Sequence, residues 1–191
     1  MDQDEALRAG ITRRAANGAD ILYRFAGEGD SVEAMTELLH RAYAPLAQAG
    51  LHYMASHQAP DVTRRRMGKG QTVVAATPDG TIVGTVTLAR ASATSGSPFY
   101  DQPDVASFGQ FGVETALQNL GIGSTLLSVV EALALQRGVG HLALDTSEQA
   151  AALIRLYTSR GYRLIETAQW PDVNYRSVIL AKARAQLRRT V

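Results

Sequence analysis

The sequence contains no cysteine among its 191 residues. Disulfide bonds, thiolate metal sites and a cysteine nucleophile are therefore excluded. Long apolar runs are also missing, since none approaches the roughly 18 residues that a membrane-spanning helix needs. The first residues, Met1 to Ala9, are polar and acidic, without the apolar stretch of a signal peptide. These absences predict a soluble cytoplasmic protein with no membrane partner.

An excess of charge of either sign is missing as well. Charged residues make up 19% of the chain and the formal net charge is +1, which is not typical of a general polyanion binder. We therefore expect no nucleic-acid partner. The four histidines lack the spacing of metal ligands, and we expect no metal site. Two basic stretches are interpreted as solvated: the Arg64-Arg65-Arg66 run and a C-terminal tail over residues 182–191.

What is present is enough apolar sequence for one domain, since 46% of the residues are hydrophobic at a length that normally forms a single core. Residues 1–20 are interpreted as a leader of low structural content and residues 21–181 as the domain, followed by the basic tail. There is no internal repeat and no linker long enough to divide the chain.

Hydrophobic periodicity and turn signals predict a mixed α/β chain. Asp30 and Glu33 form a capping box that opens a helix ending at Pro45, and Thr146 to Gln149 form a second capping box. Residues 72–76 and 81–90 are expected to form a hairpin around the turn of residues 77–80. The two final strands are expected to pair antiparallel, and the central strand-helix-strand is expected to make a right-handed parallel crossover. The predicted strands cover residues 21–26, 72–76, 81–90, 105–113, 139–145, 162–168 and 175–180, and the other helices lie within 60–67, 121–137 and 150–160.

The segment from Gln118 to Thr125 joins a predicted strand to a predicted helix and contains Gly121 and Gly123. Glycines at such a junction let a ligand approach the backbone closely. The first N–H groups of a helix have no intrahelical partner and lie at the positive end of its dipole. Together these features favour an anion site, most naturally for a phosphate, to which Ser124 and Thr125 can add hydroxyl donors. A plain helix start with glycines for packing fits the same spacing.

Two familiar phosphate-binding motifs fit this turn poorly. A P-loop requires Gly-Lys-Ser/Thr, and no lysine is present here. A dinucleotide-binding turn places G-x-G-x-x-G directly after its strand, whereas Leu126 occupies the third glycine position and residues 113–120 separate the strand from Gly121. Asp145 does stand about 20 residues further on, where a ribose-binding acid would lie, so this fold stays a minor alternative.

The turn resembles instead the signature of the GNAT superfamily of acyl-CoA-dependent N-acyltransferases. That signature has Gln or Arg, two variable residues, Gly, one variable residue, and Gly or Ala. Gln118, Gly121 and Gly123 match it, while Asn119 stands where a glycine is usual. The preceding residues 111–114 resemble the family's fourth strand, which ends in an apolar residue, a variable residue, Val, and an acid or His.

A second block strengthens the resemblance. The strand that ends near Asp145, the helix carrying Leu156-Tyr157, and Gly161-Tyr162 resemble the family's next strand, helix and closing Gly-aromatic pair. The element order from residue 21 to residue 180 is similar to the family fold. The resemblance implies a GNAT-like α/β (α+β) fold, with a mixed, mostly antiparallel central sheet, one parallel β-α-β crossover and helices on both faces.

The resemblance also implies a function, namely transfer of the acetyl group of acetyl-CoA to a primary amine by direct attack in a ternary complex. Tyr157 resembles the family's general acid, and Val113 the position whose backbone amide faces the thioester carbonyl. The base is open between Glu114, Asp145 and a relay through water. The residues expected to bind acetyl-CoA or coenzyme A are Phe111, Val113, Gln118, Asn119, Leu120, Gly121, Ile122, Gly123, Ser124 and Thr125.

The acceptor is a small-molecule or peptide amine that the sequence does not identify, and a homodimer is compatible with the chain. The acceptor pocket is expected between the first helices, the loop 91–104 and the last hairpin. Candidates by location are Tyr43, His52, Tyr53, His57, Tyr100, Trp170 and Asn174. The rival function is a non-catalytic acyl-CoA-binding regulatory module on the same fold.

Overall fold

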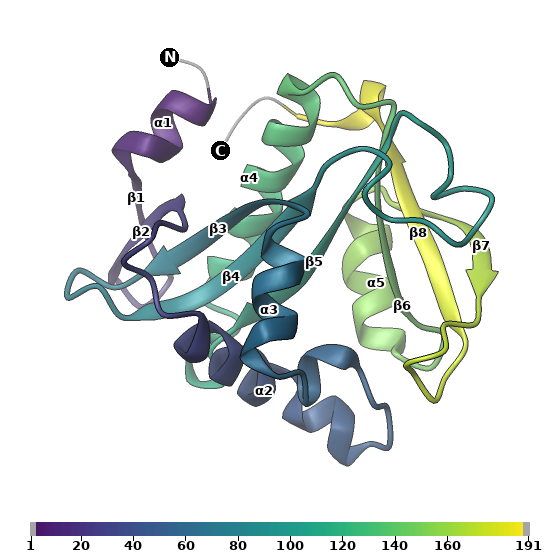
Figure 1. The fold of residues 1–191 in the computed structure, drawn as a ribbon. Helices are drawn as coiled ribbons and strands as arrows, with labels where there is room; N and C mark the ends of the chain where they lie inside the picture. The colour runs from purple at the N-terminus through teal and green to yellow at the C-terminus, as the bar shows by residue number, and fades with distance from the viewer. Residues whose placement is uncertain (1–2, 189–191) are drawn as a thin grey trace.

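A computed structural model describes residues 3–188. In this part of the chain, a single sheet of eight strands has the order β1-β2-β3-β4-β5-β6-β8-β7 (Figure 1). The strands are β1 (Ile11–Arg14), β2 (Asp20–Phe25), β3 (Gly70–Ala76), β4 (Ile82–Ala89), β5 (Val105–Val113), β6 (His141–Ser147), β7 (Arg163–Ala168) and β8 (Ser177–Ala183).

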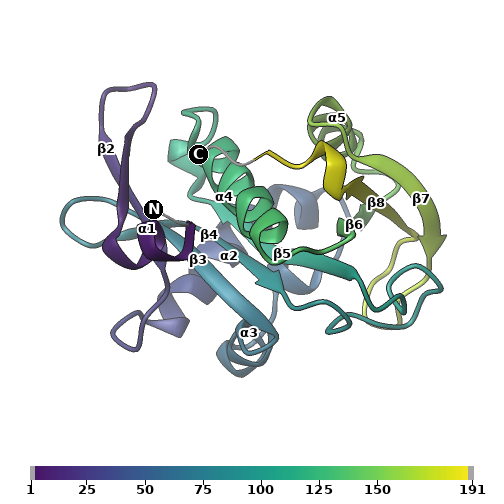
Figure 2. The same cartoon turned by 90° about the horizontal axis from the view of Figure 1, so that it is seen from above.

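Helices cover both faces of this sheet, as the resemblance implies. Figures 1 and 2 show α4 and α5 on one face and α2 and α3 on the other. None of the helices between residues 3 and 188 is long and apolar enough to cross a membrane. The helices are α1 (Gln3–Ala9), α2 (Val32–Gln48), α3 (Pro60–Met67), α4 (Ile122–Gln136) and α5 (Ala151–Ser159), with short 3₁₀ turns η1 (Met54–Ser56), η2 (Thr115–Leu117) and η3 (Arg184–Gln186).

The sheet topology confirms the pairing predicted from sequence. β3 and β4 form the expected antiparallel hairpin, and β7 and β8 pair antiparallel. β5 and β6, joined through α4, are the only parallel neighbours in the described sheet. The apolar stripe of α4 packs over the strands on one side of that seam, with Leu126 and Val130 fully buried.

The expectation of low structural content in residues 1–20 is wrong. Residues 3–9 form α1, whose Leu7 is fully buried in the core, and β1 pairs with β2 along its whole length. β1 escapes sequence patterning because it is four residues long and largely exposed, so it shows no apolar alternation. Residues 3–9 and 11–14 therefore pack with the rest of the described chain.

The predicted start and end of α2 are both corrected. Ser31, not Asp30, caps the helix, since its Oγ accepts from the Ala34 amide at 3.0 Å, while Asp30 pairs with Arg24 at 2.6 Å. Pro45 lies inside the helix. Proline has no N–H for the carbonyl four residues before it, and here the Thr115 hydroxyl donates to that carbonyl, Arg41 O, at 3.3 Å.

The predicted second capping box does not form. Thr146 and Ser147 belong to β6, and α5 begins after Ala150, which makes no side-chain cap. The Thr146 hydroxyl instead shares a hydrogen bond of 2.8 Å with the Tyr53 hydroxyl, and Ser147 Oγ accepts from the Gln149 amide at 3.1 Å.

The C-terminal tail is also more structured than expected. Lys182 is the penultimate residue of β8 and is buried, with Nζ 2.8 Å from Oε2 of the buried Glu131. Arg160 Nε lies 3.2 Å from Oε1 of the same carboxylate. Leu187 is buried in the main core. Only residues 189–191 of the predicted tail lie outside the described residues.

We expect Lys182→Met to lower the free energy of unfolding by about 2 kcal/mol, as for losing a charged hydrogen bond. The loss is smaller than for an isolated buried pair because Glu131 keeps its contact with Arg160. Urea denaturation measures it. The control is Arg176→Met, which removes the exposed pair with Glu148 and should cost less than about 1 kcal/mol. Equal losses in the two variants would contradict a stabilising role for the buried pair.

Candidate functional site

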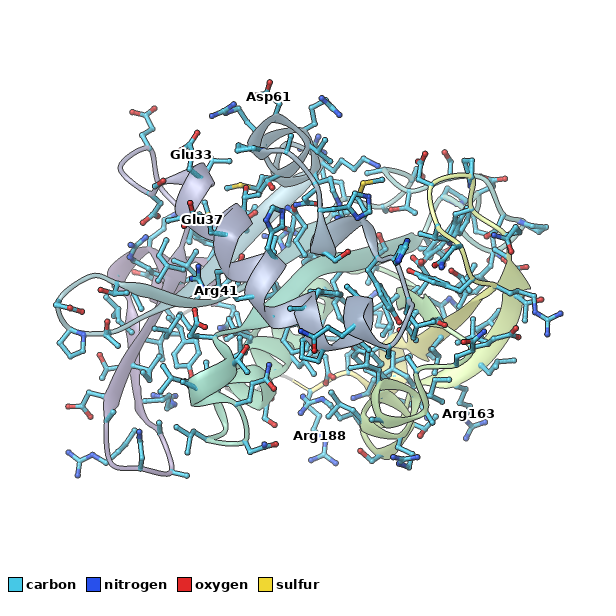
Figure 3. All side chains as sticks on the ribbon, turned by 90° about the horizontal axis from the view of Figure 1, so that it is seen from below. Glu33, Glu37, Arg41, Asp61, Arg163 and Arg188 are labelled. Carbon is cyan, nitrogen blue, oxygen red and sulfur yellow. The ribbon has the colours of Figure 1, made fainter. Side chains whose placement is uncertain are left out.

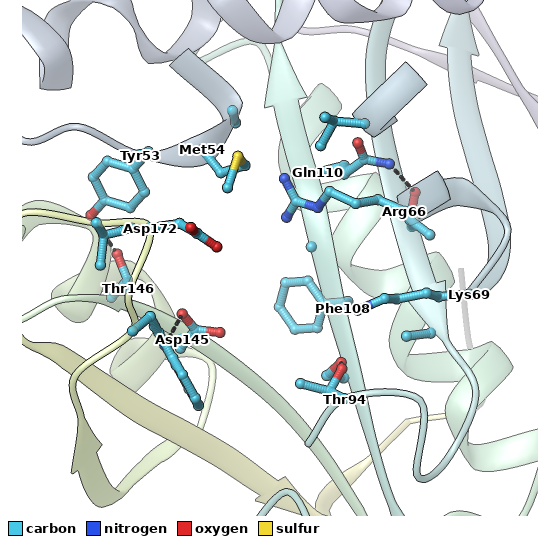
Figure 4. A pocket seen from close by; sticks show the side chains of 18 of the residues that line it. Tyr53, Met54, Arg66, Lys69, Thr94, Phe108, Gln110, Asp145, Thr146 and Asp172 are labelled. Carbon is cyan, nitrogen blue, oxygen red and sulfur yellow. Dashed lines mark hydrogen bonds between the residues drawn. The ribbon is translucent and has the colours of Figure 1, made fainter. Parts of the chain in front are cut away.

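The two parallel strands β5 and β6 separate after a short contact. Their register covers only Val105 with His141, Ala106 with Leu142 and Ser107 with Ala143. Beyond these pairs the strands diverge, and an open cavity of about 910 Å³ is lined from both sides of the divergence. β5 contributes Phe108 to Gln110, and β6 contributes Asp145 and Thr146 (Figure 4).

β5 contains a β-bulge, opposite β4, in the stretch that lines the cavity. The register with β4 changes between Thr85 and Thr87, which pair with Gly112 and Gly109, so β5 contains one extra residue. Gln110 has a φ of 48°, which is unusual for a residue with a side chain. A bulge bends its strand and re-aims side chains. Here it directs the Gln110 side chain into a buried polar network.

The end of β5 presents free backbone toward the diverging edge. The Glu114 amide donates to the carbonyl oxygen of Val83, near the start of β4, at 2.8 Å. Successive backbone groups of an extended strand point to opposite edges, so the N–H and C=O of Val113 point away from β4. The Gln118 side chain takes up that carbonyl, with Nε2 donating to Val113 O at 3.2 Å. The Val113 N–H is left facing the separation between the strands.

The glycine turn has the backbone geometry of an anion site. Asn119 and Gly121 have φ angles of 63° and 89°, and Gly121 is the N-cap of α4. A Cβ on Gly121 would meet no atom within 4 Å, so the space in front of the turn is open. The first amides of α4, beginning with Ile122, have no intrahelical acceptor. The turn can therefore direct several N–H groups at one anion.

The remaining residues of the turn hold its shape. A Cβ on Gly123 would lie 3.3 Å from Phe111 Cζ, so glycine here allows α4 to pack closely on β5. The Leu120 carbonyl accepts from the Ala16 amide of the β1–β2 turn at 3.0 Å. The Thr125 hydroxyl donates to Gly121 O at 3.2 Å, which commits its only proton, and the Ser124 hydroxyl is the one better placed to donate to a ligand.

Tyr157 of α5 lies in the wall of the cavity. Its ring is buried and packs edge-on against Phe108 and Tyr162, with centroids 6.0 Å away in each case. Its hydroxyl makes no hydrogen bond to any other described residue. Burial, followed by the nearby Tyr43, Tyr53 and Asp145, raises the pKa of Tyr157 well above its ordinary value. The phenol therefore stays protonated and has a proton to donate.

Glu114, a candidate base, is held in an ion pair away from the cavity lining. Arg41 Nε and Nη2 lie 3.0 and 2.9 Å from Glu114 Oε2, and the Thr115 amide donates to Oε1 at 3.1 Å. Figure 3 shows Arg41 projecting from α2 beside Glu37. In this arrangement, Glu114 also connects α2 to the end of β5.

Asp145, the other candidate base, points into the cavity from β6 (Figure 4). Its carboxylate accepts from Tyr100 Oη at 3.2 Å and from Trp170 Nε1 at 3.0 Å. Solvent reaches the side chain through the cavity, while protein encloses it elsewhere. This enclosure raises the pKa of the Asp145 carboxyl, although the two hydrogen bonds and the charge of Arg66 oppose the shift.

The cavity also includes part of the predicted acceptor pocket. Tyr43, Tyr53 and Trp170 line it, and Tyr100 reaches it through Asp145. The other three candidates, His52, His57 and Asn174, are not among the lining residues. Asn174 has a structural role, since its amide binds Gly50 O at 2.8 Å and the His52 N–H at 2.9 Å.

Arg66 and Lys69 are cavity residues that the sequence analysis missed. The interpretation of the arginine run as solvated holds for Arg64, which pairs with Asp61 at 2.7 Å on the outside of α3. Arg66 points into the cavity (Figure 4), where its Nη1 donates to Gln58 Oε1 at 2.7 Å. Helical spacing separates Arg64 from Arg66, but no sequence signal says which of the two faces inward.

Comparison with known proteins identifies relatives of this chain. The model of the acetyltransferase (GNAT) family matches residues 32–162. The S-(2-succino)cysteine N-acetyltransferase of Bacillus subtilis (strain 168) is 30% identical over 142 residues, which cover 73% of this chain and 82% of that protein.

Solved structures with the same fold cover nearly the whole chain. The GNAT domain of PAT from S. lividans has a TM-score of 0.68 at 19% identity and covers 91% of this chain and 96% of that one. A GNAT family acetyltransferase from Elizabethkingia anophelis with acetyl-CoA bound has a TM-score of 0.60 at 16% identity and covers 85% of this chain and 97% of that one. At these identities, the likeness concerns the fold.

Proposed function

Because the chain belongs to the acetyltransferase (GNAT) family, we propose that it transfers the acetyl group of acetyl-CoA to a primary amine by direct attack in a ternary complex. Membership makes the protein an acyl-CoA-dependent acetyltransferase. One observation carries the proposed chemistry. The cavity opens where β5 leaves β6, with a buried tyrosine in its wall and a helix N-terminus at the far end of β5.

The glycine turn would hold the pyrophosphate of acetyl-CoA. The open space beside Gly121 and the free amides of α4 suit a charged phosphate. From there the separated edge of β5 leads back toward the cavity. The expected binding residues are those of the turn, from Gln118 to Thr125, together with Phe111 and Val113.

The thioester would be attacked where β5 presents its free amide. A neutral amine adds to the carbonyl carbon, the C–N bond forms, and negative charge moves to the carbonyl oxygen. The Val113 N–H, which faces the separation between the strands, would stabilise that oxygen as its charge develops. The C–S bond then breaks and releases coenzyme A as a thiolate.

Tyr157 would donate its phenolic proton to that thiolate and would take up in turn the proton that the acylated nitrogen loses. Its hydroxyl is not committed to any described partner, and burial keeps it protonated. A general acid must reach the leaving group through the cavity, and Tyr157 lies in the cavity wall. The ammonium proton of the acceptor must leave by another route, for which Asp145, Glu114 and water are the candidates.

The geometry favours Asp145 over Glu114 as the base, because Asp145 lines the cavity while Glu114 is bound to Arg41. We expect Asp145→Asn to lower kcat about tenfold, below the usual span for a general base because water can replace it. The carboxylate is the active form, so wild-type kcat should fall as pH drops through the raised pKa of Asp145. The Asp145→Asn variant should not show this fall in kcat at low pH.

The matched variant is Glu114→Gln, and kcat against pH at saturating amine distinguishes the two. A loss in Glu114→Gln alone would assign the base to Glu114. If neither variant changes kcat while chemistry limits the rate, the proton leaves through water.

Thiol release from acetyl-CoA tests the proposed function. The acceptor panel comprises amino acids, polyamines, aminoglycosides and peptides with free N-termini. It includes S-(2-succino)cysteine, because the 30% identical relative is named for acetylating it. Turnover with any primary amine is the expected result. Binding of acetyl-CoA without thiol release from any amine would favour the non-catalytic binding module.

A further inference from the structure

One wall of the cavity carries cations that lack counter-ions. Arg65, Arg66, Lys69 and Arg90 all line it. Among residues 3–188, none of these four forms an ion pair, whereas seven other arginines do. Figure 4 shows Arg66 and Lys69 projecting from the α3 side into the open space. A wall of this kind attracts an anionic group.

Arg66 is held in place by a buried network. Its Nη1 donates to Gln58 Oε1, and Gln58 Nε2 donates to Thr63 Oγ1 at 2.6 Å and to Gln110 Oε1 at 2.9 Å. Gln58, Thr63 and Gln110 are each at most 3% exposed. Gly109 leaves room for the guanidinium, since a Cβ there would lie 3.3 Å from Arg66 Nη2. The bulge in β5 thus places Gln110 in the network that holds the Arg66 side chain in position.

Enclosure of Arg66 has an energetic consequence. Burial lowers the pKa of the guanidinium, a shift that Tyr43 and Asp145 oppose, and within residues 3–188 no carboxylate forms an ion pair with it. Arginine nevertheless stays charged in proteins. A charge held this way is relieved by an anionic partner, and the fork of N–H groups suits a carboxylate.

The opposite wall carries the opposite charge. Asp145 and Asp172 face Arg66 and Lys69 across the cavity (Figure 4). Asp145 and Arg66 are close enough for each to affect the other's pKa. A ligand with an ammonium near Asp145 and an anionic group toward Arg66 would match both walls.

We infer that the acceptor is a primary amine that also bears a carboxylate, an amino-acid-like zwitterion whose carboxylate binds Arg66 with Lys69 as the second cation. This inference rests on the proposed function, and it names the chemical class of the acceptor. Polyamines and aminoglycosides carry several positive charges and no carboxylate. They would place cations against the Arg66 wall, so the arrangement of charges disfavours them.

Thiol release with matched amines tests the inference. The pairs are glycine with glycinamide, β-alanine with β-alaninamide, and 4-aminobutyrate with 4-aminobutyramide, in each of which the only carboxylate becomes an amide. For the glycine pair the amide lowers the pKa of the adjacent amine, so that comparison is biased against the inference. We expect the best carboxylated acceptor to exceed its amide partner by about tenfold in kcat/KM, as for loss of one charged hydrogen-bond pair.

Two neighbouring arginines of α3 supply the variant and its control. Arg66→Met removes the cavity cation and should bring that ratio near one, mainly through KM for the amine, with KM for acetyl-CoA unchanged. Arg64→Met removes the solvent-facing arginine that pairs with Asp61 and Glu33 and should leave the ratio as in the wild type. Circular dichroism checks that both variants fold.

Each outcome decides the question. The inference is overturned if a polyamine, an aminoglycoside or an amide partner turns over faster than every carboxylated amine. It is also overturned if folded Arg66→Met keeps the wild-type ratio of kcat/KM between a carboxylated amine and its amide partner. If no amine releases thiol, the proposed function fails separately. Calorimetry with malonate then tests the carboxylate site directly. Malonate binding to wild type that is lost in Arg66→Met would support the site, and no binding to wild type would overturn it.

Discussion

Replacing Tyr157 by Phe is expected to lower kcat about 10²-fold, within the usual span for general acid catalysis. Phe keeps the ring that packs edge-on against Phe108 and Tyr162, so the fold should be unchanged. It removes only the hydroxyl, which has no hydrogen-bond partner among residues 3–188. KM for acetyl-CoA should change little, because the missing proton acts when the thiolate departs. Steady-state thiol release with any accepted amine measures both constants.

The control is Tyr162→Phe in the same aromatic cluster. The Tyr162 hydroxyl lies 3.3 Å from Glu131 Oε1 and bonds to it, on the ion-paired side of the core. Its loss should lower stability by about 1 kcal/mol and leave kcat unchanged. Full kcat in Tyr157→Phe, measured where chemistry limits the rate, would remove Tyr157 as the acid. A loss of stability without a loss of kcat would show that Tyr157 serves packing alone.

Gly121→Val is expected to lower the affinity for coenzyme A about 10²-fold, equal to ~2.7 kcal/mol. Two effects combine. The φ of 89° disfavours any residue with a Cβ, and the new side chain would occupy the open space in front of the α4 amides. The first effect turns the N–H groups away from the pyrophosphate, and the second blocks its approach to them. Isothermal titration of coenzyme A into the folded variant measures the loss.

Gly138 provides a matched control at the other end of the same helix. It also has a positive φ, of 71°, and its Cβ would lie 3.7 Å from Arg184. Gly138→Val therefore imposes similar backbone strain without touching the turn. Its affinity for coenzyme A should equal that of wild type. Equal losses in both variants would mean that helix strain, and not the anion site, determines binding.

Local patterns account for the parts of the fold that the sequence predicted. The hairpin of β3 and β4 follows from β-branched residues around Pro78-Asp79-Gly80, and the glycines of the turn follow from helix-start chemistry. The errors share a cause, because each depended on residues distant in sequence. Pro45 stays inside α2 because Thr115, 74 residues from Arg41, donates to the Arg41 carbonyl. Thr146 bonds to Tyr53 rather than capping α5.

The candidate site divides in the same way. The turn and Tyr157 are found by short motifs, since each lies within one contiguous block. The cation wall is not, because Arg66 turns inward through Gln58 and Gln110, which lie 52 residues apart in the chain. Periodicity cannot tell Arg64 from Arg66 when both are charged and the helix is polar on most sides. The sequence leaves Asp145 as one of three open choices for the base, and its place in the cavity follows only from the fold, which sets Tyr100 and Trp170 beside it.

The contact between Ala16 and Leu120 couples two distant parts of the chain. Ala16 belongs to the turn of the N-terminal hairpin, which lies outside residues 32–162 matched by the family model. Because this hydrogen bond joins the hairpin to the glycine turn, a change that makes the hairpin more rigid also limits the backbone conformations of the turn. Coupling of this kind is reciprocal, so a cofactor that orders the turn stabilises the hairpin by the same free energy. Selection can therefore adjust cofactor affinity through residues that never contact it.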